Sequence, residues 1–266
     1  MGMFDAAQMP EGGSRLAIIA LPGLKLFKPG DDIAEAIAGA LARANQILAD
    51  GDVLVVAQKI VSKAEDRAVA LKDVQISPAA RALAEQSGKD AALAQLILDE
   101  SETIMRVKPG LVIARHRLGT VAANAGIDAS NVASEGGETV LLWPRDPDAS
   151  AKRLRLALEA RFGVKLAVIV SDSLGRAWRM GTLGTAIGAS GIGCLTDRRG
   201  ETDLFGRVLQ ATLVARADEL AAAASLVIGE AAEGTPVAII RGAAYIRDET
   251  QGIGPSLRPR TEDMFT

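Results

Sequence analysis

The stretch "KLAVIVSDSLGRAWRMGTLGTAIGASG", residues 165–191, decides the interpretation of this sequence. It begins with a largely apolar run that is typical of a buried strand. Asp172 and Ser173 follow at once, and after them come two arginines, Arg176 and Arg179, a tryptophan and five glycines. Arginine binds phosphates and carboxylates through its planar fork, and glycine lets backbone N–H groups approach an anion closely. The stretch therefore predicts a strand that ends in a site for a metal and an anion, a combination that suggests phosphoryl transfer.

Apolar runs and capping residues elsewhere predict the fold class. Strands are expected at 15–21, 51–61, 139–144, 207–215 and 237–242, with a hairpin at 111–127. Helices are expected to begin at Asp31 or Asp32, at Ser77–Pro78, at Asp90 and at Asp148, with another at 218–226. The second should end near Gly88, the third near Glu102 and the fourth near Phe162. Because these elements do not alternate regularly, we expect an α/β fold of mixed α+β sheets and not a Rossmann fold.

Composition and charge limit the class of protein. The 266 residues carry a net charge of −3, which argues against a nucleic-acid-binding platform. With one cysteine, no apolar run of about 18 residues and no signal-like N-terminus, we expect a cytoplasmic protein without a membrane span. No linker divides the chain, so we expect a flexible lead-in at 1–14, one catalytic unit at 15–247 and a tail or arm at 248–266.

Several familiar site types are absent or weakly supported. No G-x-x-x-x-G-K-[ST] pattern occurs, so a P-loop is not expected, and "GASGIG" at 188–193 reverses the glycine order of the dinucleotide fingerprint. His116, the single histidine, is expected at the surface or at a strand edge. Cys194 lies in an apolar segment, so we expect a buried, inert thiol.

Oxygen-bearing side chains gather at three separate places. They are Asp128, Ser130 and Asn131 in "NAGIDASN", Asp172 and Ser173 in "SDS", and Glu230 and Glu233 in "IGEAAEG". Carboxylate and hydroxyl oxygens that converge at strand ends suit Mg²⁺ or Mn²⁺. Each residue alone is equally typical of a turn or a helix cap. Basic candidates for an anion are Lys59, Lys63, Arg176 and Arg179, for which a solvated surface is the alternative.

Four motifs together carry a resemblance to a known family. They are "VVAQKIVSKAEDR" (55–67), "NAGIDASNV" (124–132), the stretch at 171–191 and "LVIGEAAEGTPVAIIRG" (226–242). In this order they are similar to the coenzyme F420-0:L-glutamate ligase family, the GTP-dependent γ-glutamyl ligases of F420 biosynthesis, over about residues 15–247. The resemblance implies a family-specific ligase fold, an intertwined homodimer and the single-domain version of the enzyme. Asp66 departs from the pattern, because the family often has glycine there.

The resemblance also implies site residues and cofactors. It implies two divalent cations, Mg²⁺ or Mn²⁺, together with K⁺, on metal ligands Asp128, Asp172, Ser173 and Glu230. Lys63, Arg176 and Arg179 are the implied catalytic cations. The residues implied for GTP are Leu21, Pro22, Gly23, Leu24, Gln58, Lys59, Lys63, Asn131, Ile228, Gly229, Glu230, Ala231, Ala232, Glu233, Gly234 and Thr235.

The implied reaction joins L-glutamate to F420-0 through an acyl phosphate made with GTP. Two alternatives stay open from the residues alone. One is a ligase of the same chemistry that uses another carboxylate acceptor, and the other is a non-catalytic module that binds GTP.

Overall fold

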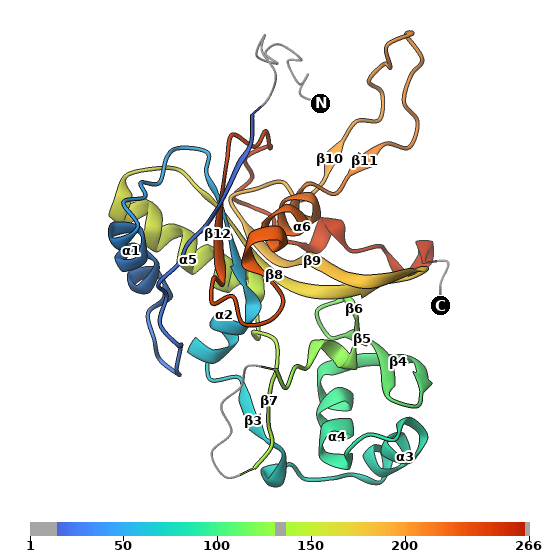
Figure 1. The fold of residues 1–266 in the computed structure, drawn as a ribbon. Helices are drawn as coiled ribbons and strands as arrows, with labels where there is room; N and C mark the ends of the chain where they lie inside the picture. The colour runs from blue at the N-terminus through green and yellow to red at the C-terminus, as the bar shows by residue number, and fades with distance from the viewer. Residues whose placement is uncertain (1–14, 131–136, 264–266) are drawn as a thin grey trace.

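A five-stranded sheet forms the centre of the computed structural model, which describes residues 15–130 and 137–263 (Figure 1). The β2 and β8 strands run parallel, and all other neighbouring strands in this sheet run antiparallel. The sheet is therefore mixed, as the irregular order of elements predicts. Its strands, in spatial order, are β1 (Ala17–Ala20), β12 (Val237–Arg241), β2 (Val53–Ala57), β8 (Ala167–Arg176) and β9 (Arg179–Ser190).

Helices cover both faces of this sheet, which explains the uninterrupted apolar runs of β2, β8 and β12. Side chains such as Leu54 and Val56 face α1 (Ile33–Arg43) and α5 (Pro147–Phe162). The alternate residues, such as Val53, pack with α6 (Arg216–Ile228) on the other face. Each fully buried aliphatic side chain contributes roughly 1.5–3 kcal/mol to folding, so these two layers hold the sheet in place.

A smaller lobe follows β2 in the chain and lies below the central sheet in Figure 1. Its capping residues Ser77, Gly88 and Asp90 are confirmed by the structure. A two-stranded ribbon, β3 with β7, connects this lobe to the sheet. The helix α2 (Gln58–Ala64) packs on the core of the main sheet and leads from β2 into the lobe. The elements of the lobe are β3 (Ala68–Ala70), α3 (Pro78–Ser87), α4 (Ala91–Glu100), β4 (Ser101–Lys108), β5 (Leu111–His116), β6 (Val121–Ala123) and β7 (Thr139–Leu141).

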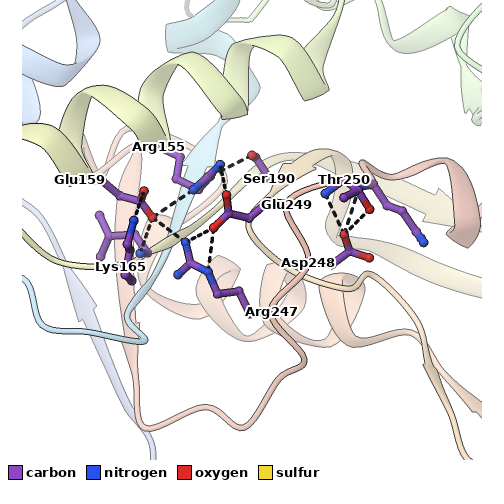
Figure 2. Close-up of polar contacts among 10 residues, drawn as sticks. Arg155, Glu159, Lys165, Ser190, Arg247, Asp248, Glu249 and Thr250 are labelled. Carbon is purple, nitrogen blue, oxygen red and sulfur yellow. Dashed lines mark hydrogen bonds and ion pairs between the residues drawn. The ribbon is translucent and has the colours of Figure 1, made fainter. Parts of the chain in front are cut away.

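The C-terminal segment is tied to the main sheet by a partly buried ionic network, which Figure 2 shows. The Arg155 side chain is 1% exposed, and its Nε donates to Ser190 Oγ at 3.0 Å. Arg247 Nη2 donates to Glu159 Oε1 at 3.1 Å and to Glu249 Oε1 at 2.5 Å. These contacts fix residues 247–249 against α5 and β9. Past them, the segment forms short helical turns at Gly254–Ser256 and Arg260–Glu262.

Two predicted strands are wrong in their extent. The run at 51–61 leaves the sheet after Ala57, and α2 begins at Gln58; the adjacent residues Ile60 and Val61 both pack in the same core cluster, as neighbours on a helix can and successive residues of a strand do not. Of 207–215, only Leu213–Val214 forms a strand, β11, which pairs with β10 (Thr196–Asp197) at the base of a projecting arm, and Val208 makes a single bridge to Thr202.

Two predicted helix boundaries also need correction. The fourth helix is capped by Asp146, whose Oδ1 accepts from Ala149 N at 2.9 Å, and not by Asp148. Asp148 instead accepts backbone N–H groups from β9 and from the C-terminal segment. The third helix ends at Glu100, since Ser101 begins β4, a strand whose mixed polar sequence gave no clear apolar signal.

Candidate active site

A cavity of about 510 Å³ opens where β2 ends and its parallel pairing with β8 stops, at Ala57 and Ser171. Parallel strands present their carboxyl ends at one edge of a sheet, so the residues after each strand meet there. The β2 strand is followed by α2, which brings Lys59 and Lys63, while β8 brings Asp172 and Ser173. The lining residues are Leu24–Phe27, Ala57–Ile60, Lys63, Ser171–Ser173, Gly184, Ser225 and Ile228–Pro236.

Asp128 belongs to the smaller lobe and is not among the lining residues, but it pairs with Lys59, which lines the cavity. Lys59 Nζ lies 2.7 Å from Asp128 Oδ2. The backbone of Asp128 is fixed by two hydrogen bonds with Leu141 at the end of β7. Burial by itself raises the pKa of Asp128, but Lys59 and the hydrogen bonds from Ser130 outweigh it and lower that pKa. The carboxylate is therefore held in its charged form.

Asp172 is a partly exposed carboxyl group at the floor of the site. Its Oδ2 accepts the indole N–H of Trp143 at 2.7 Å, and its Oδ1 accepts Ser173 N at 2.9 Å. Desolvation by the surrounding protein raises the pKa of Asp172 to about 6, against the opposing effects of these two hydrogen bonds and of Lys59. The value of about 6 already includes a smaller upward contribution from the negative charge of Asp128. Two carboxyl groups that interact in this way are stabilised by a cation between them.

The donor set fits a hard divalent cation in part. Asp128, Asp172 and the hydroxyl of Ser173 supply oxygen ligands of the kind that Mg²⁺ and Mn²⁺ take. Glu230 lines the same cavity. Within residues 15–130 and 137–263, however, no three acidic, histidine or cysteine side chains stand together as a metal-binding group. The described side chains thus provide two carboxylates for an ion, and the remaining positions would fall to substrate or water.

Donors for an anion surround the carboxyl pair. The pKa of Lys63 is lowered, mainly because the side chain is partly buried and next because of the positive charge of Lys59. The negative charge of Asp128 opposes this shift. Gln58 is buried and accepts from Ser62 Oγ at 2.7 Å, and its Nε2 has no hydrogen-bond partner among the described residues. A buried donor of this kind costs about 1–3 kcal/mol unless a ligand satisfies it. Gln58 therefore supports a ligand site.

The loop after α6 closes another side of the cavity. Gly229 adopts φ +78° and ψ 174°, a backbone conformation that is essentially restricted to glycine. Glu233 Oε2 accepts the N–H of Ala231 at 2.8 Å. The Thr235 hydroxyl donates to the carbonyl oxygen of Val227 at 2.9 Å, which holds the loop on the end of α6. The loop thus presents a carboxylate bound by backbone N–H groups at the cavity.

Comparisons with known proteins match this chain over most of its length. The family profile described as "F420-0:Gamma-glutamyl ligase" matches residues 23–242. The chain belongs to the F420-0:gamma-glutamyl ligase family. It is 47% identical to the coenzyme F420:L-glutamate ligase of Methanothermobacter thermautotrophicus, over 94% of this chain and 98% of that relative. It is 48% identical to the enzyme of that name from Methanopyrus kandleri (85% and 87%) and 42% to that from Archaeoglobus fulgidus (86% and 88%).

Some residues predicted for this family member's site lie away from the cavity. Leu21 is fully buried in the core, and Gly23 uses its carbonyl oxygen to accept Arg43 Nη2 at 2.8 Å. Pro22 is exposed, and of the 21–24 segment only Leu24 lines the cavity. Asn131 lies outside the described residues. The cavity lining also includes Lys25, Leu26 and Phe27, which no motif had indicated.

The second half of the opening stretch forms a long hairpin, not a loop at a strand end. Asp172 and Ser173 lie within β8, and Arg176 pairs with Arg179 at the far tip. There Trp178 is 89% exposed, and neither arginine lines the cavity. The basic pair is thus not brought to the carboxylates within one described chain.

Glycines of the hairpin have a packing role that the sequence did not indicate. A Cβ at Gly184 would lie 2.4 Å from the carbonyl oxygen of Ala221 in α6. A Cβ at Gly188 would lie 2.4 Å from Pro147 Cβ in α5. Real Cβ contacts of this length do not occur, so these glycines let both helices approach β9 closely.

Three single-residue expectations have clear outcomes. His116 is fully buried against Glu100, because a deep ionic cluster holds it, so its predicted surface position is wrong. Cys194 is buried, as predicted, and burial raises its pKa to about 12. Asp66 is exposed with φ +53°, the left-handed conformation in which glycine is most favourable, and it lies outside the cavity lining.

No helix in the described part of the chain is long and apolar enough to cross a membrane.

Proposed function

We propose that this protein is a GTP-dependent ligase that joins L-glutamate to coenzyme F420-0 and extends the γ-linked glutamate tail. Family membership and the names of the curated relatives support the glutamate-ligating activity. The observation that carries the proposal is the interacting carboxyl pair Asp128 and Asp172 beside Lys59, of which Asp172 and Lys59 line one cavity. The proposal includes Mg²⁺ or Mn²⁺ at two sites, with K⁺, in a cytoplasmic homodimer.

The proposed reaction activates a carboxylate before the amide forms. A carboxylate oxygen of F420-0 attacks the γ-phosphorus of GTP, and the bond from that phosphorus to GDP breaks. The amine of glutamate then attacks the acyl carbon, inorganic phosphate leaves, and the amine loses a proton. When bound, the divalent cation neutralises phosphate charge and orients the γ-phosphoryl group for this transfer.

Residues of the cavity take separate parts in this scheme. Asp128, Asp172 and Ser173 hold the cation, with Glu230 approaching it from the loop after α6. Lys63 carries a positive charge toward the transferred group, and the buried Gln58 amide donates to the nucleotide. Arg176 and Arg179 lie at the hairpin tip, so in a dimer they would act on the partner's substrate or not at all.

The test is an incubation of the purified protein with F420-0, L-glutamate, GTP and MnCl₂, followed by mass spectrometry. We expect a mass increase of one or more glutamyl residues that is lost when EDTA is added or when ATP replaces GTP. Asp128→Asn should abolish the product while thermal unfolding stays cooperative. The matched control is Asp99→Asn, an exposed carboxylate on α4, which should leave the rate unchanged.

The other outcomes separate the alternatives. Ligation with EDTA present, or full activity of Asp128→Asn, would refute the assignment of the metal ligands. GTP binding without ligation of F420-0 would favour a different carboxylate acceptor if GDP release needs an acceptor. It would favour a non-catalytic GTP-binding module if no GDP forms.

A further inference from the structure

Trp143 joins the candidate active site to a buried part of the smaller lobe. Its indole is fully buried, and its Nε1–H donates to Asp172 Oδ2 at 2.7 Å. Because Ser173 N donates to the other carboxyl oxygen, both oxygens of Asp172 have a fixed donor. A carboxylate held at both oxygens keeps one orientation while each oxygen can still accept from a further ligand.

Both the backbone and the indole of Trp143 are held in place. Arg67 Nε donates to the carbonyl oxygen of Trp143 at 2.8 Å, and the His116 ring lies against the indole with centroids 4.8 Å apart. A Cβ at Gly126 would lie 2.2 Å from Trp143 Cε2, so the backbone of Gly126 lies against the ring. Gly126 has φ +72° and is two residues before Asp128. The turn that presents Asp128 thus also packs on the donor to Asp172.

Glu100 contacts both residues that hold Trp143, namely Arg67 and His116. It accepts Arg67 Nη2 at 2.9 Å and lies 3.2 Å from His116 Nε2. His116 Nδ1 accepts the N–H of Leu118 at 3.0 Å, which leaves the ring proton on Nε2 for Glu100. The orientation of the ring beside Trp143 is therefore set by hydrogen bonds at both nitrogens.

We propose that Trp143 is a positioning residue for the cation site: its indole N–H sets the orientation of the Asp172 carboxylate. This inference rests on the proposed function, in which Asp172 holds a divalent cation. Hydrogen bonds to ligating carboxylates of this kind typically change metal affinity or activity 10–100-fold when they are removed. A tryptophan that only filled the core would affect stability and leave cation affinity unchanged.

The two tryptophans of the chain make a matched experiment possible. Trp143→Phe keeps an aromatic ring and removes the donor, while Trp178→Phe makes the same change at an exposed position. We expect the dissociation constant for Mn²⁺, measured by EPR titration of the protein without nucleotide, to rise at least tenfold in Trp143→Phe. It should stay at the wild-type value in Trp178→Phe. An unchanged constant in Trp143→Phe would overturn the proposal.

A second measurement removes only the N–H group. In a Trp178→Phe background, global replacement of tryptophan by β-(3-benzothienyl)alanine changes Trp143 alone and puts sulfur where the N–H was. We expect the urea midpoint to stay near that of the background and the Mn²⁺ dissociation constant to rise at least tenfold. Unchanged affinity in this isostere, or no Mn²⁺ binding by wild type, would overturn the inference.

Ligation assays on the same samples separate the two proposals. A wild type that binds Mn²⁺ but forms no product would contradict the proposed function, and the Mn²⁺ titrations would still decide the role of Trp143. A wild type that ligates, with Trp143→Phe equal to it in rate and in Mn²⁺ affinity, would refute the positioning role alone.

Discussion

Replacing Glu100 by glutamine should remove an acid-sensitive part of the protein's stability. The Glu100 side chain is 11% exposed and contacts Arg67, His116 and Arg117. Burial alone raises the pKa of Glu100, but the hydrogen bond from His116 and the charges of the two arginines outweigh it. The pKa of Glu100 is thereby lowered from 4.5 to about 2. The carboxylate is thus favoured in the folded state.

The sign and the size of the effect follow from this shift. A pKa lowered on folding stabilises the protein above the unfolded-state value of 4.5, and this stability is lost as pH falls toward 2. At about 1.4 kcal/mol per pH unit, the contribution is about 3 kcal/mol at pH 7 and about 1 kcal/mol at pH 3. Glu100→Gln should therefore lower the free energy of unfolding most at neutral pH.

Urea unfolding followed by tryptophan fluorescence at pH 7, 5, 4 and 3 measures this difference. We expect the gap between wild type and Glu100→Gln to shrink by at least half between pH 5 and pH 3. The control is Glu35→Gln, which removes an exposed ion pair with Arg161 and should change stability by less than about 1 kcal/mol at each pH. A gap for Glu100→Gln that is constant with pH would refute the assigned ion-pair environment.

Two further predictions concern packing and thiol chemistry. Gly188→Ala should lower the free energy of unfolding by about 1–3 kcal/mol, because its Cβ would meet Pro147. Gly175→Ala, with no atom within 4 Å of its Cβ, should be close to neutral, and equal urea midpoints for the two variants would contradict the close approach. DTNB should not modify Cys194 in the native protein at pH 8, because this thiol is buried and its pKa is raised. Reaction at the unfolded-state rate would disprove this.

Local signals in the sequence are strong where the structure depends on local chemistry. Ser77 and Asp90 cap helices because their side-chain oxygens accept the N–H groups of the first turn, a contact within three residues. The buried strands were predictable because both faces of the sheet are covered, so nearly every residue in them is apolar. The switch from β2 to α2 was missed because apolar residues continue across Ala57 without a turn signal.

The candidate site depends on contacts between residues far apart in the chain. Asp172 and Ser173 were predicted from their position after an apolar run, and they line the cavity. The pairing of Lys59 with Asp128 spans the whole smaller lobe, so no local pattern could specify it. Burial of His116 likewise depends on Glu100 across a hairpin, which a lone histidine in "ARHRLG" does not reveal.

The two parts of the fold supply different halves of the candidate site, and this arrangement has a physical consequence. The central sheet and the helix that follows β2 bring Asp172 and Lys59. The smaller lobe brings Asp128, which precedes β7 in the chain, and Trp143, which follows it. Two carboxyl groups repel each other, so bringing the lobe against the sheet costs free energy unless a cation or a donor compensates. Lys59 and the Trp143 indole provide that compensation within the chain. A divalent ion between the carboxylates would therefore add to the same contact between lobe and sheet, so its binding should be linked to the stability of that contact.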